Sequence, residues 1–187
     1  MNAALPSLGA LEISTVARGH FVGDEMIKAA PVRLLRAAPL SPGKFWILIS
    51  GGVAEVEASL QMGRLAAGES LLDSLFLPGV HPGVSEALAG RCPPAREQAL
   101  GIVETATASS GVRAADRALK TAPVLLYQLR LANGLGGKAY FTVGGEVSDV
   151  TAAVEAAERE AASVQQFVAR EIIARPHPEF LRGVLGL

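Results

Sequence analysis

The sequence predicts an α+β chain of two tandem domains, each with the order strand, helix, strand, strand, helix, strand. The first observation is an internal repeat: the chain reads G-A-L-E from Gly9 and G-I-V-E from Gly101. Later, Ala30-Pro31-Val32 returns as Ala122-Pro123-Val124. The second observation is that apolar residues change spacing between strand-like and helix-like segments within each copy. The repeat therefore indicates two small domains, each of which needs a neighbour to bury its apolar surface.

One loop breaks the register between the copies. Glu12 corresponds to Glu104 and Lys28 to Lys120, but Leu40-Ser41-Pro42-Gly43 is replaced by the longer, glycine-rich segment from Ala132 to Gly137. A chain that duplicates a whole domain and varies one loop is expected to place its specificity in that loop.

The individual elements follow from apolar periodicity and from the positions of glycine and proline. In the second copy, Val112, Ala115 and Leu119 lie three and four positions apart on one helical face, and Pro123 ends that helix. The expected strands of this copy are 99–105, 124–131, 138–143 and 166–174, and its helices are 108–122 and 147–162. In the first copy the expected strands are 11–16, 32–38, 45–49 and 71–77, and the helices are 21–30 and 53–68.

This order of elements predicts an antiparallel sheet with two helices on one face, which is a ferredoxin-like layering. A polar, proline-bearing stretch separates the copies. We therefore expect a first domain over 1–90, a linker over 91–98, and a second domain with a C-terminal tail over 99–187.

Composition restricts the class of protein. Half of the 187 residues are apolar and 19% are charged, which suggests that apolar surface is buried between subunits. The net charge of −1 gives no basic surface for nucleic acid. No apolar run reaches the length of a membrane span, and the N-terminus lacks the pattern of a signal peptide. Cys92 is the single cysteine, so no intrachain disulfide forms, which fits the cytoplasm.

No constellation of residues predicts catalysis. Ser41-Pro42-Gly43-Lys44 resembles the end of a phosphate-binding loop, but a strand follows it and no Ser or Thr comes after the lysine. His20, His81 and His177 lack a histidine or cysteine partner at metal-ligand spacing. We therefore expect no enzyme activity, no cofactor and no metal site.

Two pairs of charged residues recur in the copies. Asp24 and Lys28 lie four positions apart on the first predicted helix, and Asp116 and Lys120 repeat that spacing in the second copy. By default such pairs are solvated i, i+4 ion pairs. Their recurrence places both lysines at the same edge of each domain.

The motifs of the second copy resemble a known family. A-L-G-I-V-E-T from Ala99, A-A-D-R-A-L-K from Ala114, the glycine-rich loop and Arg175-Pro176-His177 are similar to the shell-protein domain of bacterial microcompartments. Two such domains in one chain resemble the tandem, trimer-forming class known as BMC-T, in its non-permuted version. Within that class, Ser41-Pro42-Gly43-Lys44-Phe45 is similar to T-type subunits of the propanediol-utilisation kind.

The resemblance implies that the protein is a structural tile of a microcompartment shell, and that this shell lies in the cytoplasm. Three chains would form a flat pseudo-hexamer, partnered by other shell hexamers, trimers and pentamers, with no membrane or nucleic acid involved. The loops between the second and third strands would line a central pore that passes small polar metabolites. The implied pore-lining residues are Leu40, Ser41, Pro42, Gly43, Asn133, Gly134, Leu135 and Gly136. The implied tile-edge contacts are Lys28, Lys120, Arg175 and His177, and the first copy has no counterpart of Arg175 in Pro78-Gly79-Val80-His81.

Ser41 is the main departure from the family pattern. T-type subunits of the propanediol kind carry a cysteine at this place, and three such cysteines hold an iron–sulfur cluster on the axis. A serine hydroxyl lacks the thiolate that such clusters use, so we expect a pore without a cluster. Two alternatives stay open at this point: a redox shell protein that carries a metal or iron–sulfur centre by other ligands, and an enzyme or sensor built on duplicated ferredoxin-like domains.

Overall fold

The computed structural model describes residues 7–96, 98–132 and 134–185. Its packing divides the chain into two units. The first runs to Val80 and also includes Thr107–Ser109 and Ala132–Gly137; the second comprises His81–Ala106, Ser110–Leu131 and the chain from Lys138 onward. The segment from His81 to Gly90, which the sequence assigned to the first domain, therefore packs with the second unit.

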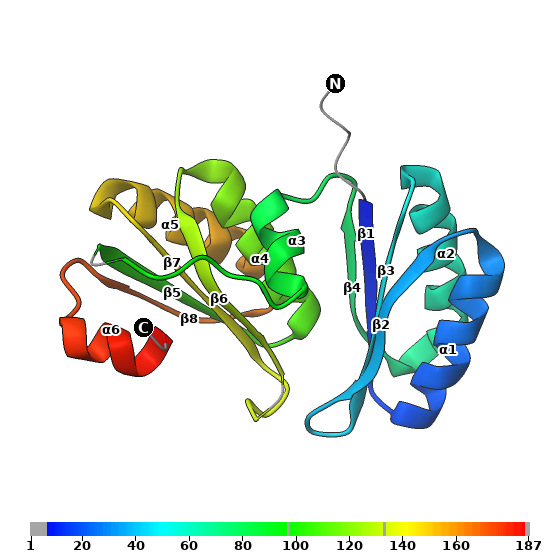
Figure 1. Cartoon of the computed structure of the whole chain (residues 1–187). Coiled ribbons are helices and arrows are strands. Elements are labelled where there is room, and N and C mark those ends of the chain that lie inside the picture. Colours follow the sequence, from blue (N-terminus) through cyan, green and yellow to red (C-terminus); the bar gives the residue numbers. More distant parts are fainter. Residues whose placement is uncertain (1–6, 97, 133, 186–187) are drawn as a thin grey trace. The chain divides into compact units, whose positions relative to one another are not determined.

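The first unit is a four-stranded antiparallel sheet with the order β2-β3-β1-β4. Helices α1 and α2 cover one face of this sheet (Figure 1). Leu11, Ile47 and Leu60 belong to the buried core between the helices and the sheet. The elements are β1 (Ser7–Ile13), α1 (Val16–Ala29), β2 (Arg33–Leu40), β3 (Lys44–Gly51), α2 (Val53–Ala67), the short 3-10 helix η1 (Gly68–Ser70) and β4 (Leu71–Leu77).

The second unit repeats this sheet with the order β6-β7-β5-β8. Side chains on β5 alternate between its two faces. The backbone of Gly101 lies against Val150 and Val154 of α5. Leu100, the preceding residue, packs with Tyr127 of β6 and Leu181 of α6, and α6 covers the opposite face (Figure 1). The elements are α3 (Pro82–Leu88), β5 (Ala99–Thr105), α4 (Ala108–Thr121), β6 (Leu125–Leu131), β7 (Ala139–Gly145), α5 (Val147–Ser163), β8 (Phe167–Ile173) and α6 (Pro178–Leu185).

The duplication extends to irregularities in strand pairing. The pairing of β2 with β3 shifts between Leu34 and Arg36, and the pairing of β6 with β7 shifts between Leu126 and Gln128. The predicted α+β class and the βαββαβ order of both copies are thus confirmed. Among the described residues, no helix is both long enough and apolar enough to span a membrane.

The structure corrects the start of the first helix. The sequence predicts a strand over 11–16 and places 21–30 in a helix, but β1 ends at Ile13, and α1 already begins at Val16 and includes Gly19 and Gly23. A Cβ atom at Gly19 would lie 2.3 Å from Cβ of Phe45, so this glycine lets α1 pack tightly against β3. Tertiary packing overrides the low helix propensity of glycine here. Helices α3 and α6 were also not predicted, although a proline stands at the first position of each, where a helix tolerates it.

Candidate functional site

The first predicted pore loop joins β2 to β3 at the end of the first sheet. Leu40 ends β2 and its side chain is buried in the core. Ser41, Pro42 and Gly43 are exposed, with a cis peptide bond between Ser41 and Pro42 and a φ of +85° at Gly43. The surface that this loop offers is therefore Ser41–Gly43, and Leu40 contributes mainly its backbone.

The second predicted pore loop lies beside the first. Residues 132–137 belong to the first unit, and Asn133 lies outside the described residues. A Cβ atom at Gly137 would lie 3.2 Å from Cδ of Pro42 and 3.0 Å from Nζ of Lys44. Gly137 also has a φ of +89°, which favours glycine. The structure thus brings together two loops that are nearly a hundred residues apart in sequence.

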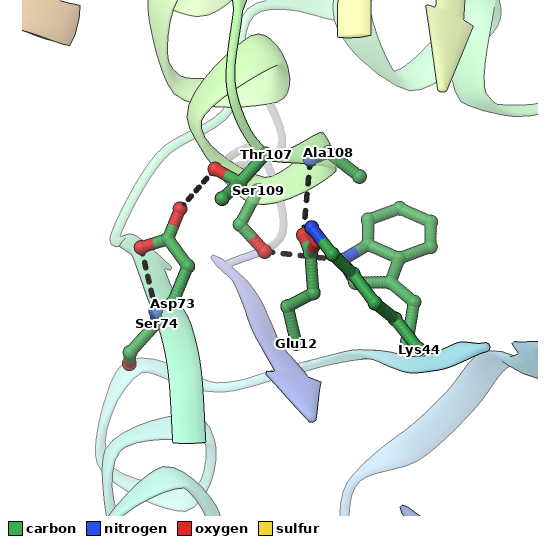
Figure 2. A network of polar contacts seen from close by, with 8 residues as sticks. Glu12, Lys44, Asp73, Ser74, Thr107, Ala108 and Ser109 are labelled. Atoms are coloured by element: carbon green, nitrogen blue, oxygen red, sulfur yellow. Dashed lines mark hydrogen bonds and ion pairs between the residues drawn. The ribbon is translucent and has the colours of Figure 1, made fainter. Parts of the chain in front are cut away.

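A buried ion pair fixes the base of the first loop. Lys44, which directly follows Gly43, donates to Oε1 of Glu12 at 2.9 Å, and the Glu12 side chain has no solvent exposure (Figure 2). Oε2 of Glu12 accepts from the backbone N–H of Ala108 at 3.0 Å, at the start of α4. Burial raises the pKa of Glu12, while the hydrogen bond from Lys44 lowers it. A carboxylate here neutralises the lysine and also caps the positive end of a helix.

Two further hydrogen bonds hold the same segment to the first sheet. Nε1 of Trp46 donates to Oγ of Ser109 at 3.1 Å, and the Thr107 hydroxyl donates to the Asp73 carboxylate (Figure 2). The repeat aligns Glu12 with Glu104, but local sequence spacing gives no pairing of Glu12 with Lys44. The repeat could have indicated this pair, because the second unit has an equivalent one. There Lys138 donates to Glu104 at 2.6 Å. That second pair is exposed in the single chain, which is the main difference between the copies here.

The predicted i, i+4 ion pairs are both present, in different environments. Lys28 contacts Asp24 on the surface, where 57% of the Asp24 side chain is exposed. Lys120 contacts Asp116 at 2.5 Å, and only 5% of the Asp116 side chain is exposed. Oδ1 of Asp116 also accepts from the backbone N–H of His81 at 2.7 Å. The segment that leads into α3 therefore shields Asp116 from solvent.

The other predicted edge residues lie just before α6. Arg175 and His177 are exposed, and Nδ1 of His177 accepts from the N–H of Glu179 at 3.3 Å. Among the described residues, no three His, Cys, Asp or Glu side chains form a group that could hold a metal ion.

Comparison with known proteins identifies the family. The model of the BMC domain matches residues 7–80 and 99–176, so the chain belongs to the BMC-domain family of microcompartment shell proteins, with two domains in tandem.

The chain spans nearly the whole of one relative and a little over half of another. The chain is 40% identical over 179 residues to the bacterial microcompartment shell protein PduT of Citrobacter freundii, covering 96% of this chain and 97% of that protein. It is 32% identical over 167 residues to the carboxysome assembly protein CcmO of Synechococcus elongatus, covering 82% of this chain and 59% of CcmO. A crystal structure of a microcompartments protein from Desulfitobacterium hafniense DCB superposes with a TM-score of 0.84 at 40% identity, covering 96% and 99% of the two chains.

Proposed function

We propose that this shell protein is a trimeric tile whose three chains surround a pore. Its role is to build the shell and to let small molecules pass, rather than to catalyse a reaction. The observation that carries the proposal is the tandem pair of BMC domains with matching sheets and matching irregularities. Each domain would offer a head and a tail surface, and heterologous contacts of this kind close into a ring when the rotation from one domain to the next closes. Three chains of two domains would give a ring of six similar domains.

The pore would be lined by the exposed parts of the two neighbouring loops. These are Ser41–Gly43 and Gly134–Gly136, and Asn133 completes the second loop in sequence. The packing of Gly137 against Pro42 supports a common location for both loops. The Ser41 hydroxyl and backbone groups would then face the channel beside Pro42 and Leu135, and these polar groups favour small polar metabolites over large apolar ones.

The tile edge would carry the remaining predicted residues. Lys28 and Lys120 occupy equivalent places on α1 and α4, and Arg175 is exposed after β8. Exposed cationic side chains suit contacts with acidic groups or carbonyls of other shell hexamers, trimers and pentamers. Because Arg175 lacks a counterpart in the first copy, alternate edges would differ in strength.

The experiment is to measure the mass of the purified protein by light scattering and to image it by electron microscopy. A mass of three chains, together with sheets or shells when other shell proteins are co-expressed, is the expected result. A protein that stays monomeric up to high concentration contradicts the proposal.

A further inference from the structure

The second unit shows how a segment that follows the last strand of a BMC domain docks on a domain. His81 comes four residues after Leu77, the end of β4, and is the N-cap of α3. Its backbone N–H donates to Asp116 of α4 at 2.7 Å, and α3 packs on β6. A Cβ atom at Gly83 would lie 3.1 Å from Cδ1 of Leu119, and the side chain of Val84 is fully buried.

The equivalent place on the first unit is an open groove of about 280 Å³. Strand pairing and the repeat align Asp24 with Asp116, Ile27 with Leu119 and Leu34 with Leu126. Ile27 and Leu34 are 37% and 46% exposed, whereas Leu119 and Leu126 are 7% and 3% exposed. The groove is lined by Gly19, His20, Gly23, Asp24, Ile27, Leu34, Ala37 and Phe45.

The chain also carries a second segment of this kind, which follows β8. His177 comes four residues after Ile173, the end of β8, and directly precedes α6 as His81 precedes α3. In both segments the histidine Nδ1 accepts from the N–H two residues later. Phe180 takes the place of Val84 and is 47% exposed.

The groove and this segment exchange side-chain volume locally. The first unit has Gly23 and Ala37 where the second unit has Ala115 and Leu129, which opens the groove at these two positions, while His20 and Phe45 replace Val112 and Ala139 at its other end. The segment that would enter it carries phenylalanine where the docked segment carries valine. Close packing favours such a compensating exchange of volume.

We propose that residues His177–Phe180 of one copy dock into the groove between α1 and β2 of a second copy. The N–H of His177 would donate to Asp24, and Phe180 would fill the apolar space beside Ile27 and Leu34. Both surfaces are exposed in the single chain, and a head-to-tail contact that repeats from copy to copy closes a ring. This inference rests on the proposed trimer and names the contact that closes it.

A cross-linking experiment tests which chain supplies the segment. The triple variant Cys92→Ser, Ile27→Cys, Glu179→Cys places one thiol in the groove and one on the docking segment, at the positions of the close pair Leu119 and Gly83. A short bis-maleimide should then link chains into covalent species of two and three times the chain mass. The two matched controls, each with only one of the introduced cysteines, should give at most a weak dimer.

The outcomes separate this contact from the proposed function. Products of single-chain mass in which both thiols are consumed would show docking within one chain and overturn the inference. Absence of cross-links in a protein of trimer mass would overturn the contact and leave the proposed tile standing. A wild-type chain of monomer mass, together with a triple variant that gives no cross-links, would overturn both.

A substitution measures the energy of the contact independently. Phe180→Asp should raise the trimer dissociation constant about 30-fold or more, because a charge would enter a desolvated groove. The matched control is Val184→Asp, since Val184 is also exposed on α6 but lies outside the segment. Circular dichroism verifies that both variants are folded. Equal dissociation constants for the two variants would contradict the inference.

Discussion

Replacing Lys44 by methionine should test whether the buried carboxylate of Glu12 depends on its partner. Glu12 is fully buried, and Lys44 is the cation that contacts it in the described structure. Removing one member of a buried ion pair typically costs about 3–5 kcal/mol. We expect about 3 kcal/mol for Lys44→Met, at the low end, because the N–H of Ala108 still donates to the carboxylate.

The loss should depend on pH in a defined direction. Burial already raises the pKa of Glu12, and Lys44→Met removes the two influences of Lys44 that lower it. A pKa above the unfolded value means that the folded state binds the proton more tightly, so its stability falls as the pH rises through the folded pKa. The free energy of unfolding that Lys44→Met loses should therefore be smaller at pH 5 than at pH 7.5.

The assay is denaturant unfolding at fixed protein concentration, followed by fluorescence of Trp46, the single tryptophan. Trp46 is buried and hydrogen-bonded within the same network. The double variant Lys44→Met, Glu12→Gln removes the charge and should recover at least about 1 kcal/mol of the loss. Arg159→Met is the control on an exposed ion pair and should cost about 0.5 kcal/mol or less. A Lys44→Met deficit below about 1 kcal/mol, or one equal at both pH values, would refute the reasoning.

Three further predictions concern packing, a helix cap and the pore. Gly19→Ala should destabilise the protein by about 1–3 kcal/mol, because its new Cβ overlaps the side chain of Phe45. Gly183→Ala, at an open position of α6, should not destabilise it, and thermal unfolding compares the two variants. Burial lowers the pKa of His81, so stability should fall as the pH drops below about 6.5, where the unfolded chain takes up the proton first. His81→Asn should lose this dependence in unfolding titrations. Ser41→Cys, reconstituted with iron and sulfide, should gain visible charge-transfer absorption, and a colourless product would place Ser41 away from the axis.

The sequence was sufficient for the features that depend on local pattern. The repeat of Gly9-Ala10-Leu11-Glu12 at Gly101 predicted two domains, and apolar spacing predicted the βαββαβ order of each. The family followed from the same motifs. The i, i+4 pairs of Asp24 and Lys28 and of Asp116 and Lys120 were also predictable, because helix geometry alone brings such residues together.

Tertiary structure decided what each repeated residue contacts. Two helices with the same Asp–Lys pair differ because His81 covers Asp116, while Asp24 borders an open groove. Likewise, Glu12 is buried against the start of α4, and Glu104 is exposed in the single chain. Sequence spacing fixes neighbours along one element, but burial and charge pairing depend on which distant segment packs there. The duplicated sequence therefore determined two domains of the same fold, and the segments that pack on them decided how far their equivalent residues are covered.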